Sequence, residues 1–171
     1  LKVPAAWDIT KGDFSNIVVA VLDVAFLTTH DDLTGKFVSG NDFADMDGVV
    51  DPILNTPARN HGTKTSSVIC ANTNNGLGIS GIGYNLKVMP LKIFKDADTL
   101  NSDGQATISA VQYAADNGAR VINLSFGGTS TSKAERAVYE YAYNKGCVLV
   151  AAAGNSNNDV PLYPAAYTRV I

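Results

Sequence analysis

The sequence predicts an α/β fold with three layers, in which helices cover both faces of a mainly parallel sheet. Two observations lead to this fold class. Segments with strand character alternate along the chain with segments of helical pattern, an order typical of parallel sheets. The six residues 17–22 form a continuous apolar run, which is typical of a parallel strand covered on both faces. With 171 residues, the chain is expected to form one domain.

The first strand is predicted over 17–23, where six apolar residues precede Asp23. A helix is predicted over 61–72, directly after Asn60, a residue type that often caps helices. The second strand is predicted over 86–93. Because ligands of open α/β sheets bind beyond the carboxyl ends of the strands, Asp23 is expected to point toward the functional site.

The second half of the chain continues this alternation. A helix is predicted over 103–118, a segment with an acidic start and a terminal glycine. A strand over 120–126, a helix over 131–146 and a strand over 147–153 follow. The final residues, Val170-Ile171, have the character of a further strand.

The composition excludes several classes of function. The chain is 46% hydrophobic and 17% charged, with 13 basic and 16 acidic residues and a net charge of −3. This mildly acidic balance, without a cluster of Lys and Arg, argues against nucleic acid as a partner. No apolar run approaches the length that crosses a bilayer, so no membrane span is expected.

Two cysteines, Cys70 and Cys147, lie in predicted core elements. Neither has the spacing of a metal or redox motif. Two buried thiols are therefore favoured, with a single disulfide as the alternative.

Three polar residues at the ends of these elements have candidate catalytic chemistry. Asp23 follows a strand, His61 opens a helix, and Asn155 follows Gly154 at the end of a strand. The positive end of the helix dipole disfavours a protonated imidazole, so His61 is expected to be neutral, as a general base must be. A fixed amide at Asn155 can donate to an oxyanion. Taken singly, each residue has an ordinary alternative: a solvated loop acid, a structural histidine and a Gly-Asn turn.

In combination, the three residues and their flanking sequences resemble the subtilisin-like serine proteases. The matching stretches occur in the family's order and extend through nearly the whole chain. They are 19–23, 30–33, 61–63, 74–83, 121–128, 151–155 and 163–165.

The resemblance implies a serine endopeptidase that hydrolyses peptide bonds with an Asp-His-Ser triad. It implies that Asp23 orients and stabilises the imidazole, that His61 acts as base and then as acid, and that Asn155 donates to the oxyanion. The implied substrate-binding residues are Ser125, Phe126, Gly127, Gly128, Ala153, Gly154 and Leu162. The first four form a cleft wall on which an extended peptide adds as a strand. Leu162, at the floor position of the specificity pocket, predicts a shallow pocket for small or medium apolar side chains.

The nucleophile of the family lies in a Gly-Thr-Ser-Met-Ala-x-Pro segment well after the oxyanion asparagine, and no such segment occurs up to Ile171. Ser130 belongs to a Gly-Thr-Ser sequence but precedes Asn155, so it is expected in a loop or helix cap. We therefore expect a C-terminally incomplete catalytic domain that is inactive alone. A C-terminal fragment or second chain would supply the serine. Without the family's serine helix, apolar surface is expected to be uncovered.

Departures from the family pattern leave an alternative function open. Val24 and Ala25 stand where the family usually has a hydroxyl residue and a glycine, and Lys64 stands where a second histidine is usual. Lys64 would disfavour the imidazolium of His61. The alternative is therefore an inactive pseudoprotease or peptide-binding scaffold. A nucleotide-binding protein is disfavoured, because 23–27 contains no glycine for a phosphate loop.

The stretch 23–51 contains seven aspartates and one lysine. Acid-rich loops are usually just solvated, but hard cations bind carboxylates together with carbonyls. The family has a calcium site of this kind. By resemblance it maps onto Asp32, Asn75 and the carbonyls of Leu77 and Ile79.

The chain begins Leu1-Lys2-Val3-Pro4, without a basic start or an apolar signal core. In the family, a signal and an inhibitory propeptide precede this point. The resemblance therefore implies a secreted or extracellular protein.

Overall fold

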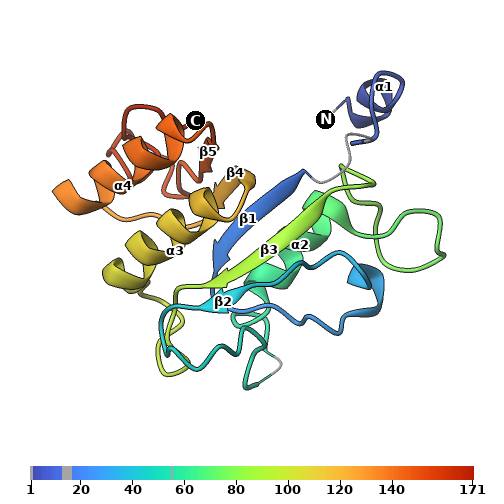
Figure 1. The fold of residues 1–171 in the computed structure, drawn as a ribbon, viewed down its shortest axis with the longest axis horizontal. Coiled ribbons are helices and arrows are strands. Elements are labelled where there is room, and N and C mark those ends of the chain that lie inside the picture. Colours follow the sequence, from blue (N-terminus) through green and yellow to red (C-terminus); the bar gives the residue numbers. More distant parts are fainter. Residues whose placement is uncertain (1, 13–16, 55) are drawn as a thin grey trace.

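The computed structural model describes residues 2–12, 17–54 and 56–171, and in this part of the chain five strands form one parallel sheet (Figure 1). The strand order is β2-β3-β1-β4-β5. The strands are β1 (Val18–Asp23), β2 (Asn41–Asp42), β3 (Lys87–Lys92), β4 (Ala119–Leu124) and β5 (Val148–Ala151). All four strands expected from the sequence are present, and the α/β prediction is confirmed.

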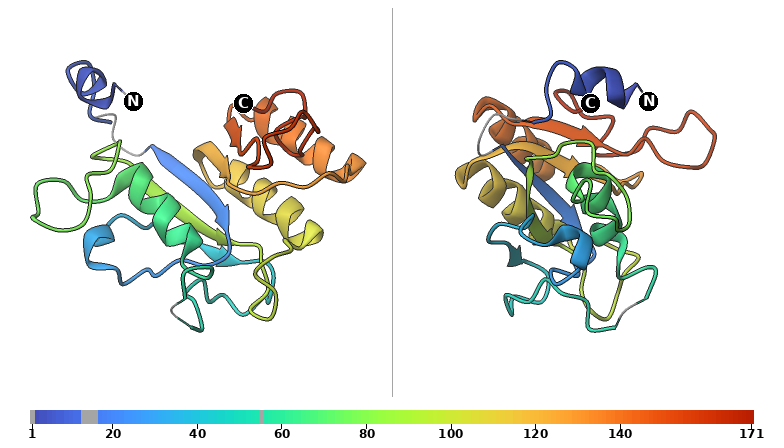
Figure 2. Two further views of the ribbon diagram at one scale, coloured as in Figure 1. Left: turned by 180° about the vertical axis from the view of Figure 1, so that it is seen from behind. Right: turned by 90° about the vertical axis from the view of Figure 1, so that its right-hand side faces the viewer.

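Helices cover both faces of this sheet, as predicted. Helix α2 (His61–Cys70) packs on one face, while α3 (Gly104–Asp116) and α4 (Lys133–Asn144) lie together on the other (Figures 1 and 2). The view from behind in Figure 2 places α2 across β1 and β3. The three-layer prediction is therefore confirmed.

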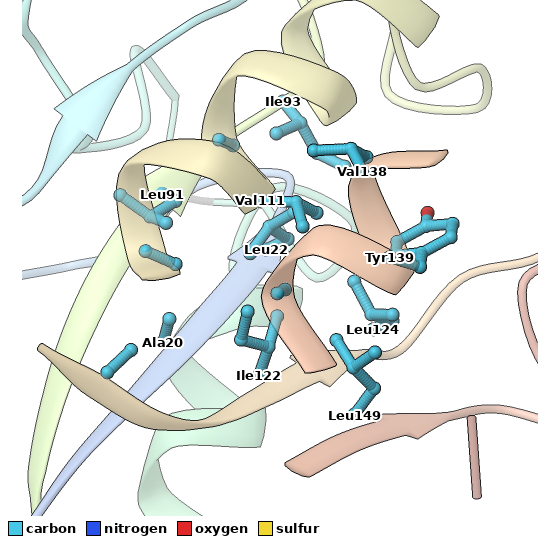
Figure 3. Close-up of a cluster of buried hydrophobic side chains, with 14 of the residues drawn as sticks. Ala20, Leu22, Leu91, Ile93, Val111, Ile122, Leu124, Val138, Tyr139 and Leu149 are labelled. Carbon is cyan, nitrogen blue, oxygen red and sulfur yellow. The ribbon is translucent and has the colours of Figure 1, made fainter. Parts of the chain in front are cut away.

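The hydrophobic core has two parts because alternate residues of each strand point to opposite faces. Ala20 and Leu22 of β1 join the cluster under α3 and α4 (Figure 3). Val19 and Val21 join the cluster under α2. This two-sided burial explains why the sequence of β1 is a continuous apolar run.

Three short elements were missing from the sequence-based expectation. They are α1 (Val3–Trp7), the 3-10 helix η1 (Asp31–Leu33) and the edge strand β2. Elements of two to five residues show no hydrophobic period, so pattern analysis does not detect them. α1 stands apart from the sheet in Figure 1, and Trp7 Nε1 donates to the carbonyl of Ile82 at 2.7 Å.

The three helices begin at or within two residues of their expected starts, at His61, Gly104 and Lys133. Asp103 accepts from the amide of Ala106 at 2.9 Å and caps α3. Ser132 caps α4 in the same way. Asn60 occupies the cap position of α2, but its side chain makes no capping hydrogen bond, so that prediction was wrong.

Both cysteines are buried free thiols, as expected. Burial raises the pKa of Cys70 to about 11. Cys147 donates its thiol to the carbonyl of Ala119 at 3.1 Å.

The sheet face that α2 covers at β1 and β3 is open at β5. Val148 is 46% exposed and Val150 is 36% exposed, whereas Leu149 between them points into the core under α4. Val68 on α2 is also exposed. These apolar side chains are exposed in the part of the chain that the structure describes. At the outer edge of β5, Val170 forms a parallel bridge with Leu149, in agreement with its strand character.

Candidate active site

The carboxyl end of β1 brings Asp23 against the first residue of α2. Nδ1 of His61 lies 2.8 Å from one carboxylate oxygen of Asp23 and 2.9 Å from the other. The buried carboxylate also accepts from the amide of Val24 at 2.7 Å. Because Nδ1 carries the proton that bonds Asp23, Nε2 of a neutral imidazole is left as an acceptor. The pair therefore presents a proton-accepting nitrogen on the side away from the carboxylate.

The pKa of His61 is raised, whereas the helix dipole alone would lower it. The hydrogen bond to Asp23 is the largest cause; desolvation lowers the pKa, the charge of Asp23 raises it, and Lys64 lowers it. Lys64 thus acts in the predicted direction, but Asp23 outweighs it. The Lys64 ammonium donates to the carbonyl of Pro57 at 3.0 Å.

Gly62 allows α2 to approach the end of β1 closely. A Cβ at Gly62 would lie 2.6 Å from the carbonyl oxygen of Ala25, 2.8 Å from the ring of Phe26 and 3.0 Å from Cβ of Asp23. Side-chain carbon atoms do not tolerate such contacts. The glycine after His61 is therefore required for the distance between the imidazole and the carboxylate.

The hydroxyl that is missing at Val24 has a partial substitute on the helix. Thr65 Oγ1 lies 3.4 Å from the carboxylate of Asp23 and 3.2 Å from the carbonyl of His61. Sequence analysis missed this contact. The signal was the spacing, because a residue four positions after His61 lies on the same helix face.

A cavity of about 320 Å³ lies beside the Asp23–His61 pair. Ser125, Phe126 and Gly127, three of the predicted cleft residues, line it. A second cavity of about 340 Å³ shares Phe126 and Gly127 and continues along Gly128. The sequence did not indicate the remaining residues common to both cavities, which are Phe94 and Leu100.

The segments 125–128 and 162–164 are held together at this cleft. The amide of Gly128 donates to the carbonyl of Tyr163 at 2.9 Å, and the amide of Tyr163 donates back at 2.8 Å. Both backbone groups of Gly128 are therefore engaged. Leu162 packs on the backbone of Gly127 and Gly154, with 2.2 Å between its Cδ1 and the place where a Cβ of Gly154 would lie.

The structure does not bring Asn155 to the Asp23–His61 pair. It lies with Ala153 and Gly154 in the exposed loop that follows β5, which extends away from the sheet in the right-hand view of Figure 2. Within the described residues, Asn155 makes no hydrogen bond, and it does not line the cavity that contains His61. Ser130 is an exposed loop residue, as expected. No serine hydroxyl in the described ranges bonds to His61.

The four residues predicted to hold calcium do come together. The buried carboxylate of Asp32 accepts from Nδ2 of Asn75 at 2.7 Å and from the amide of Ile79 at 3.1 Å. Leu77 donates its amide to Oδ1 of Asn75 at 3.2 Å. One carboxylate, an amide oxygen and loop carbonyls are donor types that fit calcium. Across the described residues, however, no three His, Cys, Asp or Glu side chains are grouped to hold a metal.

Two other aspartates of the acid-rich stretch, the buried Asp42 and the exposed Asp45, pair with an internal lysine. Lys92, 1% exposed at the end of β3, forms ion pairs with Asp42 at 3.2 Å, with Asp45, and with Asp96 at 3.5 Å. Burial lowers the pKa of Lys92, but the hydrogen bonds and charges of these aspartates outweigh burial and raise it. Burial is the main reason why the pKa of Asp42 is raised. The sequence had offered only the acidic composition of this region, not its internal cation.

None of the described helices has both the length and the apolar character needed to span a bilayer.

Comparisons with known proteins agree with this geometry. The sequence profile of the subtilase family matches residues 15–171. Thermitase of Thermoactinomyces vulgaris is 39% identical over 100% of the chain and 58% of its own length. The thermophilic serine proteinase of Bacillus sp. strain AK1 is 43% identical over 97% of the chain and 39% of its own length.

A solved protease structure from Pseudoalteromonas arctica superimposes with a TM-score of 0.86 at 29% identity, covering 100% of the chain and 59% of that structure. The chain thus spans between 39% and 59% of the length of these relatives.

Proposed function

The chain belongs to the subtilase family of serine proteases, and from this premise we propose that residues 1–171 are part of one catalytic domain of a serine endopeptidase. The observation that carries the proposal is the contact of both carboxylate oxygens of Asp23 with Nδ1 of His61, at 2.8 and 2.9 Å. This arrangement fixes the tautomer in which Nε2 is the base.

In the proposed reaction, Nε2 of His61 takes the proton of a serine hydroxyl as that oxygen attacks the peptide carbonyl. The imidazolium then gives this proton to the leaving amine. Asp23 stabilises the imidazolium, and the raised pKa of His61 supports this role because it reflects the same interaction. Asn155 would donate its side-chain amide to the oxyanion once the loop that carries it turns toward the cleft.

The peptide substrate would lie along Ser125–Gly127, beside the cavity that contains His61. Gly127 leaves its backbone open to an added strand. Gly128 would not pair with the peptide, because Tyr163 already engages its amide and carbonyl. Leu162 would close the floor of a shallow specificity pocket with Ala153 and Gly154, which supports a preference for small or medium apolar side chains.

The serine would come from a segment outside 1–171, either a C-terminal part of the same protein or a second chain. Two features support this inference. Nε2 of His61 has no serine partner among the described residues. Val148 and Val150 leave an apolar strip on the side of the sheet that carries α2, where such a segment could pack.

We also infer that calcium binds at Asp32 and the loop 74–79, where it would hold this loop against η1. Asp32, the side-chain oxygen of Asn75 and the carbonyls of Leu77 and Ile79 would be its ligands. Export from the cell is inferred from the family alone.

Peptide hydrolysis by the intact protein that carries this chain tests the proposal, with D23N and H61Q as variants. We expect each variant to reduce kcat by roughly 10⁴-fold or more, a magnitude taken from subtilisin, itself a member of this family. R136Q, which removes an exposed arginine on α4, is the control and should leave kcat unchanged. Peptide binding without turnover by the unaltered protein would instead support a catalytically inactive scaffold.

A further inference from the structure

A chain of ion pairs connects the turn before His61 to the strand beside Asp23. Lys92 lies at the buried end of this chain and reaches Asp96 at 3.5 Å. Asp96 in turn pairs with Arg59, 3.8 Å away, and its backbone carbonyl accepts from the same guanidinium. The planar guanidinium can make both contacts at once, which the single ammonium of a lysine does not reproduce.

The two ends of this series of ion pairs, Lys92 and Arg59, lie on either side of the Asp23–His61 contact. Lys92 is the partner of Asp23 in the parallel register of β1 and β3, and the amide of Ile93 donates to the carbonyl of Asp23 at 3.1 Å. Arg59 stands two residues before His61, in a turn where the amide of His61 donates to the carbonyl of Ala58 at 3.3 Å. The network therefore spans the same gap as the catalytic hydrogen bond, but by a separate route.

We propose that Arg59 is a positioning residue, which acts through Asp96 and Lys92 to hold the first turn of α2 against the strand end that carries Asp23. This inference rests on the proposed function, in which His61 is the base. Arg59 does not touch the reacting atoms. Its side chain is only 17% exposed, and Ala58 and Leu100, from the two loops that it ties together, line the cavity beside His61.

A direct charge effect of Arg59 on the imidazole is a different mechanism. The charged groups that act on His61 are Asp23 from β1 and Lys64 from α2. Asp96, from the β3 side, pairs with both Arg59 and Lys92. If Arg59 acted only as a nearby positive charge, its removal would raise the pKa of His61. If Arg59 positions the imidazole, its removal loosens the contact with Asp23 and lowers that pKa.

The experiment is an NMR titration of the His61 imidazole in the intact protein, with the resonance assigned by its loss in H61Q. Positioning predicts that R59Q, R59K and D96N all shift the pKa of His61 down toward the ordinary value of about 6.5. R136Q, which breaks an exposed pair with Glu140, is the matched control and should leave it unchanged.

A charge effect predicts opposite shifts for R59Q and D96N and none for R59K, and that pattern would overturn the proposal. An unchanged pKa in R59Q and R59K would overturn it as well. If R59Q does not fold, R59K decides, because it keeps the charge and removes the planar donor. The titration reads the imidazole itself, so a lowered pKa in a protein without peptidase activity would refute the proposed function and leave the positioning role intact.

Discussion

Asp23 engages His61 with both carboxylate oxygens while it is itself buried at the end of β1. A buried carboxylate is stabilised by the donors that surround it, and here they are an amide, an imidazole N–H and the more distant hydroxyl of Thr65. The sequence correctly indicated Asp23 and His61 from their positions at element ends. It gave the wrong direction for the pKa of His61, because helix-dipole reasoning omits the partner that burial brings within 3 Å.

The pH dependence of stability follows from this pair. The folded pKa of His61 lies above its unfolded value of 6.5, so protonated His61 stabilises the fold. This contribution is fully present below pH 6.5 and is lost as the pH rises through the folded pKa. Urea unfolding of the unaltered protein and of H61Q across this range should show a stability difference that shrinks with rising pH. A difference that grows with pH would contradict the assignment.

Helix α2 packs closely against the end of β1 at Gly62. This packing requires a glycine, and no periodic sequence pattern reveals that requirement. We predict that G62A lowers the free energy of unfolding by about 1–3 kcal/mol, because the new Cβ overlaps Ala25, Phe26 and Asp23. The same displacement should lower the pKa of His61 and the rate of peptide hydrolysis. Chemical unfolding and NMR titration measure the two effects.

The control for G62A is G104A, at the first position of α3. A Cβ there meets only a side-chain oxygen of Glu135, at 3.8 Å. G104A should therefore be neutral or slightly stabilising, since alanine favours helices over glycine by up to about 1 kcal/mol. Equal losses in the two variants would show that the close approach at Gly62 is not the cause.

The ends of β2 and β3 meet through the buried ion pairs of Lys92. Removal of the lysine leaves the buried carboxylate of Asp42 without its cation, so K92M should cost about 3–5 kcal/mol of unfolding free energy. K133M, on the exposed start of α4, should stay within about 0.5 kcal/mol of the unaltered protein. A small loss in K92M, measured by urea unfolding, would mean that water reaches the carboxylate of Asp42.

Across the whole molecule, the sequence predicted the fold class because the longer elements carry clear patterns. Local sequence alone predicts these elements: the apolar runs around 17–23 and 147–153 form strands, and Asp103 caps a helix. Local sequence does not predict the contacts between loops. The pairing of Arg59 with Asp96, or of Gly128 with Tyr163, depends on how the loops at the sheet edge pack together, and no local pattern encodes that.

The calcium site proposed at Asp32 would link a surface loop to the stability of the whole domain. If calcium binds at Asp32, the unfolding temperature should rise with calcium and fall after chelation, with about 2.7 kcal/mol of stabilisation at one hundred times Kd. D32N should abolish this response, whereas D47N, on an exposed residue of the same acid-rich stretch, should retain it. Differential scanning calorimetry with and without calcium is the measurement. An equal response in D32N would place the ion elsewhere.

If Asp23 and His61 activate a serine, that serine should react with a serine-directed fluorophosphonate. The intact protein is treated with the probe, and the modified residue is identified by mass spectrometry. We expect one labelled serine outside residues 1–171, with the labelling lost in H61Q. Absence of labelling, or a label on Ser125 or Ser130 that persists in H61Q, would contradict this expectation.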